Sequence, residues 1–123
     1  MNFAAIGLGS FGIKRARAIK ESKLGKLSAI YDSNPDILQK ASKELQVPSK
    51  DYKKILKDEN IEVIAICTPN KFHKNIIIDA LNANKHVFCE KPLARNFKEA
   101  EEIYNVSKKT KKKIQIGSNH RYL

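Results

Sequence analysis

The sequence predicts an α/β protein with a doubly wound, mostly parallel sheet and helices on both faces, in three layers. Strand-like and helix-like segments alternate five times, and parallel strands need such helical crossovers. The apolar run at 63–67 is continuous rather than alternating, which is typical of a strand buried on both faces. The first strand passes through a glycine-rich turn directly into a helix, as expected for this fold class.

The first half of the chain is predicted to begin with a strand at 2–6, because this apolar run stops at a glycine. Ile13, Ala16 and Ile19 then recur at helical spacing and predict the inner face of a helix. Ser33 and Asn34 are candidate N-caps before a proline suited to a first helical turn. The elements expected next are a strand at 27–31, a helix at 35–46 and a short helix at 51–57.

The second half repeats the alternation of strands and helices. The apolar stripe of the last helix is expected to consist of Phe97, Ala100, Tyr104 and Ser107. The predicted elements are a strand at 63–67, a helix at 70–84, a strand at 86–89, a helix at 96–109 and a strand at 113–117.

Composition favours one globular domain, predicted to span 1–123. Of its 123 residues 41% are hydrophobic and 30% charged, which excludes a disordered chain. No apolar run approaches the ~18 residues of a membrane span, and no basic segment opens a signal peptide. Cys67 and Cys89 lie in strand-like runs, so we expect reduced, buried thiols, no metal site and a cytoplasmic protein.

The formal net charge of +11 raises the question of a nucleic-acid partner, because basic domains attract phosphate. The lysines are, however, spread over nearly every predicted helix. The one dense run, at 108–113, closes a helix whose first turns are acidic, an order that complements the helix dipole. We therefore expect a solvated helix end and no nucleic-acid partner.

The glycine-rich turn carries the main functional signal. Gly7, Gly9 and Gly12 follow a strand and open a helix, and Asp32 comes twenty residues after the last glycine. In this context the pattern predicts a dinucleotide site, with pyrophosphate at the helix N-terminus. A carboxylate at Asp32 would accept hydrogen bonds from the adenosine ribose, which favours NAD. Ser33 and the basic charge keep NADP as an alternative, and a turn or helix-capping acid is the structural alternative for Asp32.

Four motifs in order resemble the cofactor domain of the glucose-fructose oxidoreductase / inositol dehydrogenase (Gfo/Idh/MocA) family. The resemblance covers nearly the entire chain. The motifs are the glycine turn, Thr68-Pro69-Asn70 with His73, Glu90-Lys91-Pro92, and the segment 117–122.

The resemblance implies hydride exchange between a nicotinamide and a hydroxyl-bearing carbon of a sugar, polyol or derivative. Lys91 would hold the substrate hydroxyl and stabilise the developing alkoxide, and Glu90 would orient it. His73 either faces the cofactor crevice or packs its ring at a helix start. The predicted catalytic residues are Lys91 and Glu90. The predicted cofactor-binding residues are Gly7, Leu8, Gly9, Ser10, Phe11, Gly12, Asp32, Ser33, Thr68, Pro69, Asn70, His73, Glu90, Lys91 and Pro92.

Family members usually continue into a second domain that binds the substrate, and these 123 residues do not contain one. We therefore expect a chain that binds NAD(H) and needs a second domain to act on a polyol. A module that binds the nucleotide without catalysis is the alternative. An uncovered sheet face would also favour self-association.

Overall fold

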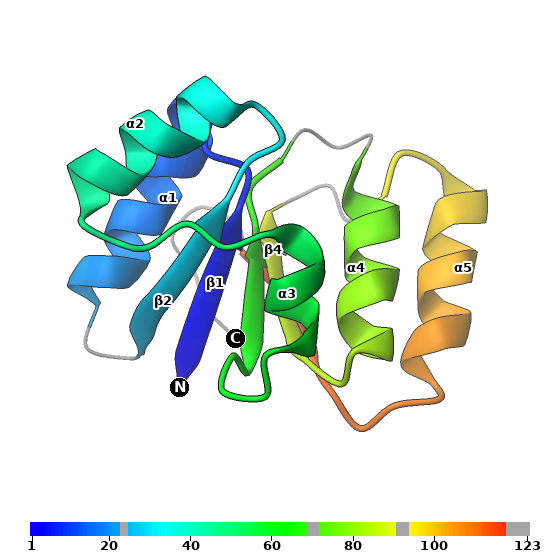
Figure 1. The fold of residues 1–123 in the computed structure, drawn as a ribbon. Helices are drawn as coiled ribbons and strands as arrows, with labels where there is room; N and C mark the ends of the chain where they lie inside the picture. The colour runs from blue at the N-terminus through cyan, green and yellow to red at the C-terminus, as the bar shows by residue number, and fades with distance from the viewer. Residues whose placement is uncertain (23–24, 69–71, 91–93, 118–123) are drawn as a thin grey trace.

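A single parallel sheet forms the centre of the molecule and confirms the predicted fold class (Figure 1). The computed structural model describes residues 1–22, 25–68, 72–90 and 94–117. In these residues five strands pair in the order β2-β1-β3-β4-β5, and all four pairings are parallel. The strands are β1 (Asn2–Ile6), β2 (Lys26–Tyr31), β3 (Val63–Ile66), β4 (His86–Glu90) and β5 (Ile114–Gly117).

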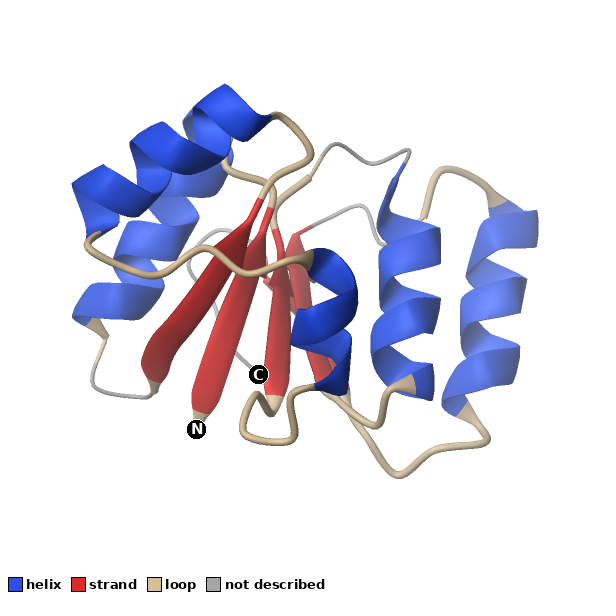
Figure 2. Ribbon diagram, in the orientation of Figure 1, coloured by secondary structure: helices blue, strands red, loops and turns tan. Residues whose placement is uncertain are grey.

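Helices cover both faces of the sheet, which gives the three expected layers (Figure 2). Helices α1 (Ser10–Glu21) and α2 (Pro35–Leu45) pack on one face, over β1 and β2. Helices α3 (Tyr52–Lys57), α4 (His73–Asn82) and α5 (Phe97–Ser107) lie on the other. The chain therefore changes direction along the sheet between β1 and β3, since β2 lies on one side of β1 and β3 on the other.

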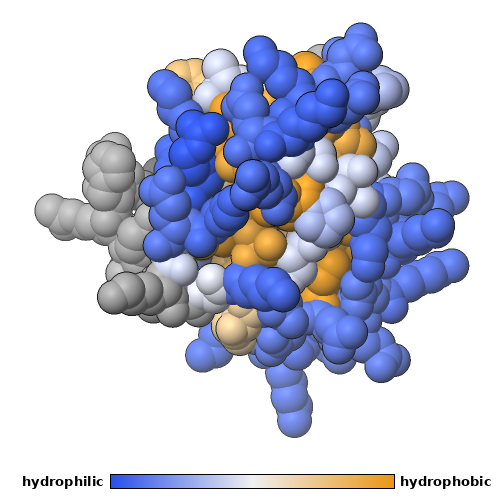
Figure 3. Space-filling model, turned by 60° about the vertical axis from the view of Figure 1, so that its left-hand side comes forward, coloured by the Kyte–Doolittle hydropathy of each residue, from blue (hydrophilic) through white to orange (hydrophobic). Residues whose placement is uncertain are grey.

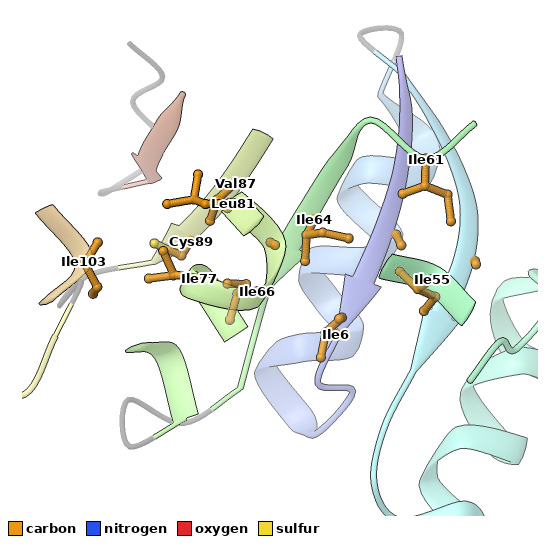
Figure 4. Close-up of a cluster of buried hydrophobic side chains, with 13 residues drawn as sticks. Ile6, Ile55, Ile61, Ile64, Ile66, Ile77, Leu81, Val87, Cys89 and Ile103 are labelled. Atoms are coloured by element: carbon orange, nitrogen blue, oxygen red, sulfur yellow. The ribbon is translucent and has the colours of Figure 1, made fainter. Parts of the chain in front are cut away.

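The hydrophobic core has two parts, one on each face of the sheet. The larger part joins strand residues such as Ile64 and Ile66 to Ile55, Ile77 and Ile103 of the three helices on that side (Figure 4). The smaller part lies under α1 and α2. All four residues of β3 are buried, as the continuous apolar run predicts.

Side-chain caps fix where three of the helices begin. The Asn34 side chain accepts hydrogen bonds from the first turn of α2, and Asp51 and Asn96 do the same for α3 and α5. Asn34 rather than Ser33 is thus the N-cap of α2. Gln46 follows α2 in a left-handed conformation, with φ of 56°.

The buried side of α5 differs from the predicted stripe. Phe97 and Tyr104 are 81% and 60% exposed, whereas Glu99 and Ile103 are buried. Glu99 can be buried because its carboxylate accepts from the Arg95 backbone N–H, at 2.9 Å, and pairs with the Arg95 guanidinium. Ala100 and Ser107 of the predicted stripe are half-buried, so the prediction was wrong for its two aromatic residues.

Two smaller expectations also need correction. The lysine run at 108–113 follows α5, which ends at Ser107, instead of forming its last turn. Cys89 is buried as expected, but Cys67 is half-buried at the end of β3. Both differences arise where an element ends one or more residues before the predicted position.

Hydrophilic side chains surround separate hydrophobic patches on the side of the molecule that carries α1 and α2 (Figure 3).

In the described part of the chain, no helix has the length and apolar character that crossing a membrane requires.

A hydrogen bond between His86, the first residue of β4, and the segment before β5 depends on pH. Its Nδ1 accepts a hydrogen bond from the Lys113 backbone N–H at 3.1 Å, which protonation of Nδ1 would abolish. Burial lowers the pKa of His86, and Lys112 and Lys113 lower it further. The folded protein therefore binds this proton less readily than the unfolded chain.

We expect His86 to contribute to a loss of stability as the pH falls below about 6.5, the ordinary histidine pKa, toward the lowered pKa of the folded state. His86→Asn keeps an acceptor near Nδ1 but does not titrate there. Urea unfolding at pH 7.5 and pH 5 should show a smaller loss of stability for the variant than for the wild type. An equal loss in both proteins would contradict this assignment.

Candidate functional site

A cavity of about 840 Å³ opens at the carboxyl edge of the sheet, between β1 and β3. The strand order changes direction at this point, because β2 lies on one side of β1 and β3 on the other. Ligands of open α/β sheets bind at such a point. Its walls come from the ends of β1, β2 and β3 and from the beginnings of α1 and α4, with Tyr52 of α3. The volume lies within the range of small-molecule sites.

The glycine turn forms the wall next to α1. Gly7 has φ of +94° and its N–H donates to the Tyr31 carbonyl at 2.9 Å. A Cβ on Gly12 would lie 2.0 Å from the Gly7 carbonyl oxygen, so the helix can approach the turn only because the side chain is absent. A Cβ on Gly9 would meet no atom of the other described residues within 4 Å, apart from its two chain neighbours.

The N-terminus of α1 differs from those of α2, α3 and α5, because no side chain among the described residues caps it. Its first turn also contains no acidic residue. Ser10, Phe11 and Gly12 of this turn line the cavity. Its free N–H groups and the helix dipole favour an anionic group such as a phosphate.

Asp32 lies at the end of β2, on the opposite side of the glycine turn. Its Oδ2 accepts from the Leu8 N–H and its Oδ1 from the Asn34 N–H, both at 2.8 Å. An ionised carboxylate offers about four acceptor positions, so two remain for a ligand. Exposed Ser33 lines the cavity beside it.

Thr68 and His73 form the wall that follows β3. The Thr68 Oγ1 is buried, and no group of the described residues gives it a hydrogen bond. The His73 ring is buried at the first turn of α4, with Nε2 2.8 Å from the Thr68 carbonyl oxygen. Nε2 must carry the proton, because a carbonyl oxygen only accepts. His73 therefore both packs its ring and borders the cavity, which combines the two alternatives left open by the sequence.

Two tyrosines form an aromatic side of the cavity, near Asp32. The Tyr31 and Tyr52 rings lie 6.0 Å apart at an angle of 41°. The Tyr52 hydroxyl donates to Asp79 Oδ2 at 2.8 Å, and burial together with this bond raises the pKa of Tyr52. The phenol therefore stays protonated and tied to α4.

The structure brings most of the described candidate residues to one cavity. Leu8 is the exception, since its side chain is buried in the core under α1 and α2. Pro69, Asn70, Lys91 and Pro92 lie outside the described residues, and of Glu90 only the backbone, at the end of β4, is described. The candidates that line the cavity are Gly7, Gly9, Ser10, Phe11, Gly12, Asp32, Ser33, Thr68 and His73.

Sequence reasoning missed several lining residues, most of which fall outside the motifs. Tyr31 and Cys67 could have been found from their positions at the carboxyl ends of strands, where this fold binds ligands. Tyr52 gave no comparable signal, because its helix lies between β2 and β3 outside any motif. The missed residues are Ile6, Arg15, Tyr31, Tyr52, Ile66, Cys67, Phe72, Asn75 and Ile76.

Metal ligands are not grouped in the described structure: among its residues, no set of three or more His, Cys, Asp or Glu side chains is placed to hold a metal ion.

The fold and this cavity together define a dinucleotide-binding domain of the Rossmann type. The family model described as "Oxidoreductase family, NAD-binding Rossmann fold" (GFO_IDH_MocA) matches residues 1–118. The chain belongs to this family, as its four motifs predict, and is an NAD-binding domain of the oxidoreductase type.

Inositol dehydrogenases are among its relatives. Myo-inositol 2-dehydrogenase of Thermotoga maritima is 32% identical over 99% of this chain and 37% of its own length. The structure of myo-inositol 2-dehydrogenase from Lactobacillus plantarum is 36% identical, with a TM-score of 0.84 over 95% of this chain and 36% of its own. Scyllo-inositol dehydrogenase from Lactobacillus casei, solved with bound NAD(H) and scyllo-inositol, is 32% identical, with a TM-score of 0.85 and the same coverage. The chain thus spans just over a third of the length of these relatives.

The described residues fit a nicotinamide dinucleotide. The uncapped first turn of α1 and the open space at Gly9 suit a pyrophosphate, and the remaining acceptor positions of Asp32 suit ribose hydroxyls. The Thr68 hydroxyl supplies a buried polar atom that a ligand could pair with.

Proposed function

We propose that the chain is the cofactor-binding part of a dehydrogenase that acts on inositol or a related polyol or sugar. The cavity that joins the glycine turn, Asp32 and Thr68 is the observation that carries the proposal. The inositol dehydrogenases among the relatives support the substrate class. When bound, the nicotinamide exchanges a hydride with a hydroxyl-bearing carbon.

The residues of this chain would divide the work. The first turn of α1 binds the pyrophosphate, Asp32 the adenosine ribose, and Thr68 with Pro69 and Asn70 the nicotinamide ribose. By resemblance to the family, Lys91 holds the substrate hydroxyl and stabilises negative charge on its oxygen, and Glu90 orients Lys91. A lysine ammonium suits this role because it donates hydrogen bonds and carries positive charge.

A calorimetric titration of the purified chain with NADH and then with NADPH tests the binding proposal. We expect micromolar affinity for NADH and much weaker binding of NADPH, because the 2′-phosphate would approach the Asp32 carboxylate. Absence of binding for both nucleotides would refute the proposal. Equal binding would overturn the role of Asp32 in selecting NAD and favour the NADP alternative.

A turnover assay distinguishes a dehydrogenase from the alternative, a module that binds the nucleotide without catalysis. Steady formation of NADH from NAD and an inositol by the purified chain would exclude that alternative. Loss of this turnover in Lys91→Ala, with NADH binding retained, would then support the role of Lys91.

Gly9→Ala is expected to weaken NADH binding by about tenfold or more, equivalent to about 1.4 kcal/mol. The added methyl group would project into the space where the backbone must approach the pyrophosphate. Stability should stay unchanged, because this methyl group has no close contact with the part of the chain that the structure describes. Calorimetry and urea unfolding measure the two quantities, and unaltered NADH affinity would place the pyrophosphate elsewhere.

A further inference from the structure

The contacts of Asp32 extend beyond the ligand side of the cavity. Its Oδ2 accepts a 2.8 Å hydrogen bond from Leu8 N–H, which lies inside the glycine turn. Next to it, the Gly7 N–H donates to the Tyr31 carbonyl at 2.9 Å. Two consecutive amides of the turn are thus held by two consecutive residues at the end of β2.

The same carboxylate also connects to α2. Its Oδ1 accepts from the Asn34 N–H at 2.8 Å, and the Asn34 side chain caps α2 through the N–H groups of Asp36 and Ile37. A continuous set of hydrogen bonds therefore runs from the glycine turn through Asp32 to the start of α2. None of these bonds involves a ligand.

We infer that Asp32 is a positioning residue for the glycine turn, in addition to accepting hydrogen bonds from the ribose. Leu8 is 3% exposed, so solvent has little access to its N–H. If Asp32 is removed, this N–H loses its acceptor and the turn loses its tie to β2. The pyrophosphate site then changes even for a ligand that makes no contact at position 32.

The positioning role of Asp32 affects which cofactor a variant can select, a point that rests on the proposed function. Removal of the Asp32 carboxylate alone would be expected to admit the 2′-phosphate of NADP. If Asp32 also positions the turn, a change of preference to NADP requires a side chain that removes the charge but still accepts from Leu8 N–H. Asn meets both requirements, whereas Ala meets only the first. Because Asn has a single acceptor oxygen, it would lose the hydrogen bond from Asn34 N–H.

Hydrogen exchange in the absence of nucleotide tests the positioning role directly. In the ligand-free chain we expect the Leu8 amide to exchange at least tenfold faster in Asp32→Ala than in the wild type, and Asp32→Asn to retain most of the protection. Asp36→Ala, which removes a carboxylate from the first turn of α2, is the matched control and should leave Leu8 exchange unchanged. A Leu8 amide that exchanges equally in wild type and Asp32→Ala would overturn the inference.

Nucleotide binding by the same variants provides a second readout. We expect Asp32→Asn to bind NADPH at least tenfold more tightly than Asp32→Ala, with NADH binding weakest in Asp32→Ala. Equal binding of NADPH by the two variants would contradict the inference. Failure of the wild type to bind either nucleotide would refute the proposed function and leave the exchange result to decide the positioning role. Urea unfolding confirms that each variant is folded at the temperature used.

Discussion

Gly12→Ala is expected to abolish NADH binding and to lower the free energy of unfolding by about 3 kcal/mol. The new methyl carbon would lie 2.0 Å from the Gly7 carbonyl oxygen and 2.7 Å from its carbonyl carbon. Both are backbone atoms, so no side-chain rotation relieves the overlap. Helix α1 would have to move away from β1, and the cavity wall would move with it.

Urea unfolding and calorimetric titration with NADH measure the two effects of Gly12→Ala. The matched variant is Gly9→Ala, which adds the same methyl group three residues earlier in open space. We expect Gly9→Ala to lose affinity at constant stability, whereas Gly12→Ala loses both. Wild-type stability in Gly12→Ala would show that α1 can shift without cost, contrary to the packing described.

The second large effect is expected at Lys85, which precedes β4 and is 3% exposed. Its ammonium donates to the Asp58 carbonyl at 2.7 Å and to the Ile61 carbonyl at 2.6 Å, in the loop that leads into β3. Burial lowers the pKa of Lys85, which the nearby Asp58 carboxylate partly opposes. The lysine thus joins the beginnings of two adjacent strands.

Lys85→Ala should lower the free energy of unfolding by about 3 kcal/mol, because two carbonyl groups lose a charged donor. Lys85→Met separates this loss from the loss of side-chain volume, and we expect it to retain only part of the stability. Lys53→Ala, at an exposed lysine of α3, is the control and should change stability by less than about 0.5 kcal/mol. Urea unfolding of the three variants gives the comparison, and a Lys85→Ala protein as stable as the control would contradict the assigned role.

The sequence predicted the order and type of the ten elements found in the described residues, because the periodicity of each apolar segment reflects the burial that it has in the fold. The prediction was wrong in detail where a polar residue is buried through a specific partner, as Glu99 is by Arg95. Composition cannot show such a pairing, since it depends on how the turn before α5 folds back.

For the candidate site, the sequence identified the parts that come from continuous motifs and missed those that come from tertiary proximity. The glycine turn and Asp32 were recognised from their spacing. Tyr52 borders the same cavity from α3, where its hydroxyl donates to Asp79 of α4. Likewise, spacing predicted a carboxylate that faces a ribose, but not that the Leu8 N–H would use one of its oxygens.

Because the cavity lies between β1 and β3, it forms only when these two strands pair during folding. Ala4 of β1 pairs with Ile64 of β3, sixty residues later, whereas neighbouring strands on either side of this pair are closer in sequence. Closing the longer loop costs more chain entropy, so this pairing joins two locally connected halves. The cavity that we propose binds the nucleotide lies across that junction and exists only after the halves have met. NADH binding during refolding would then report the completed sheet.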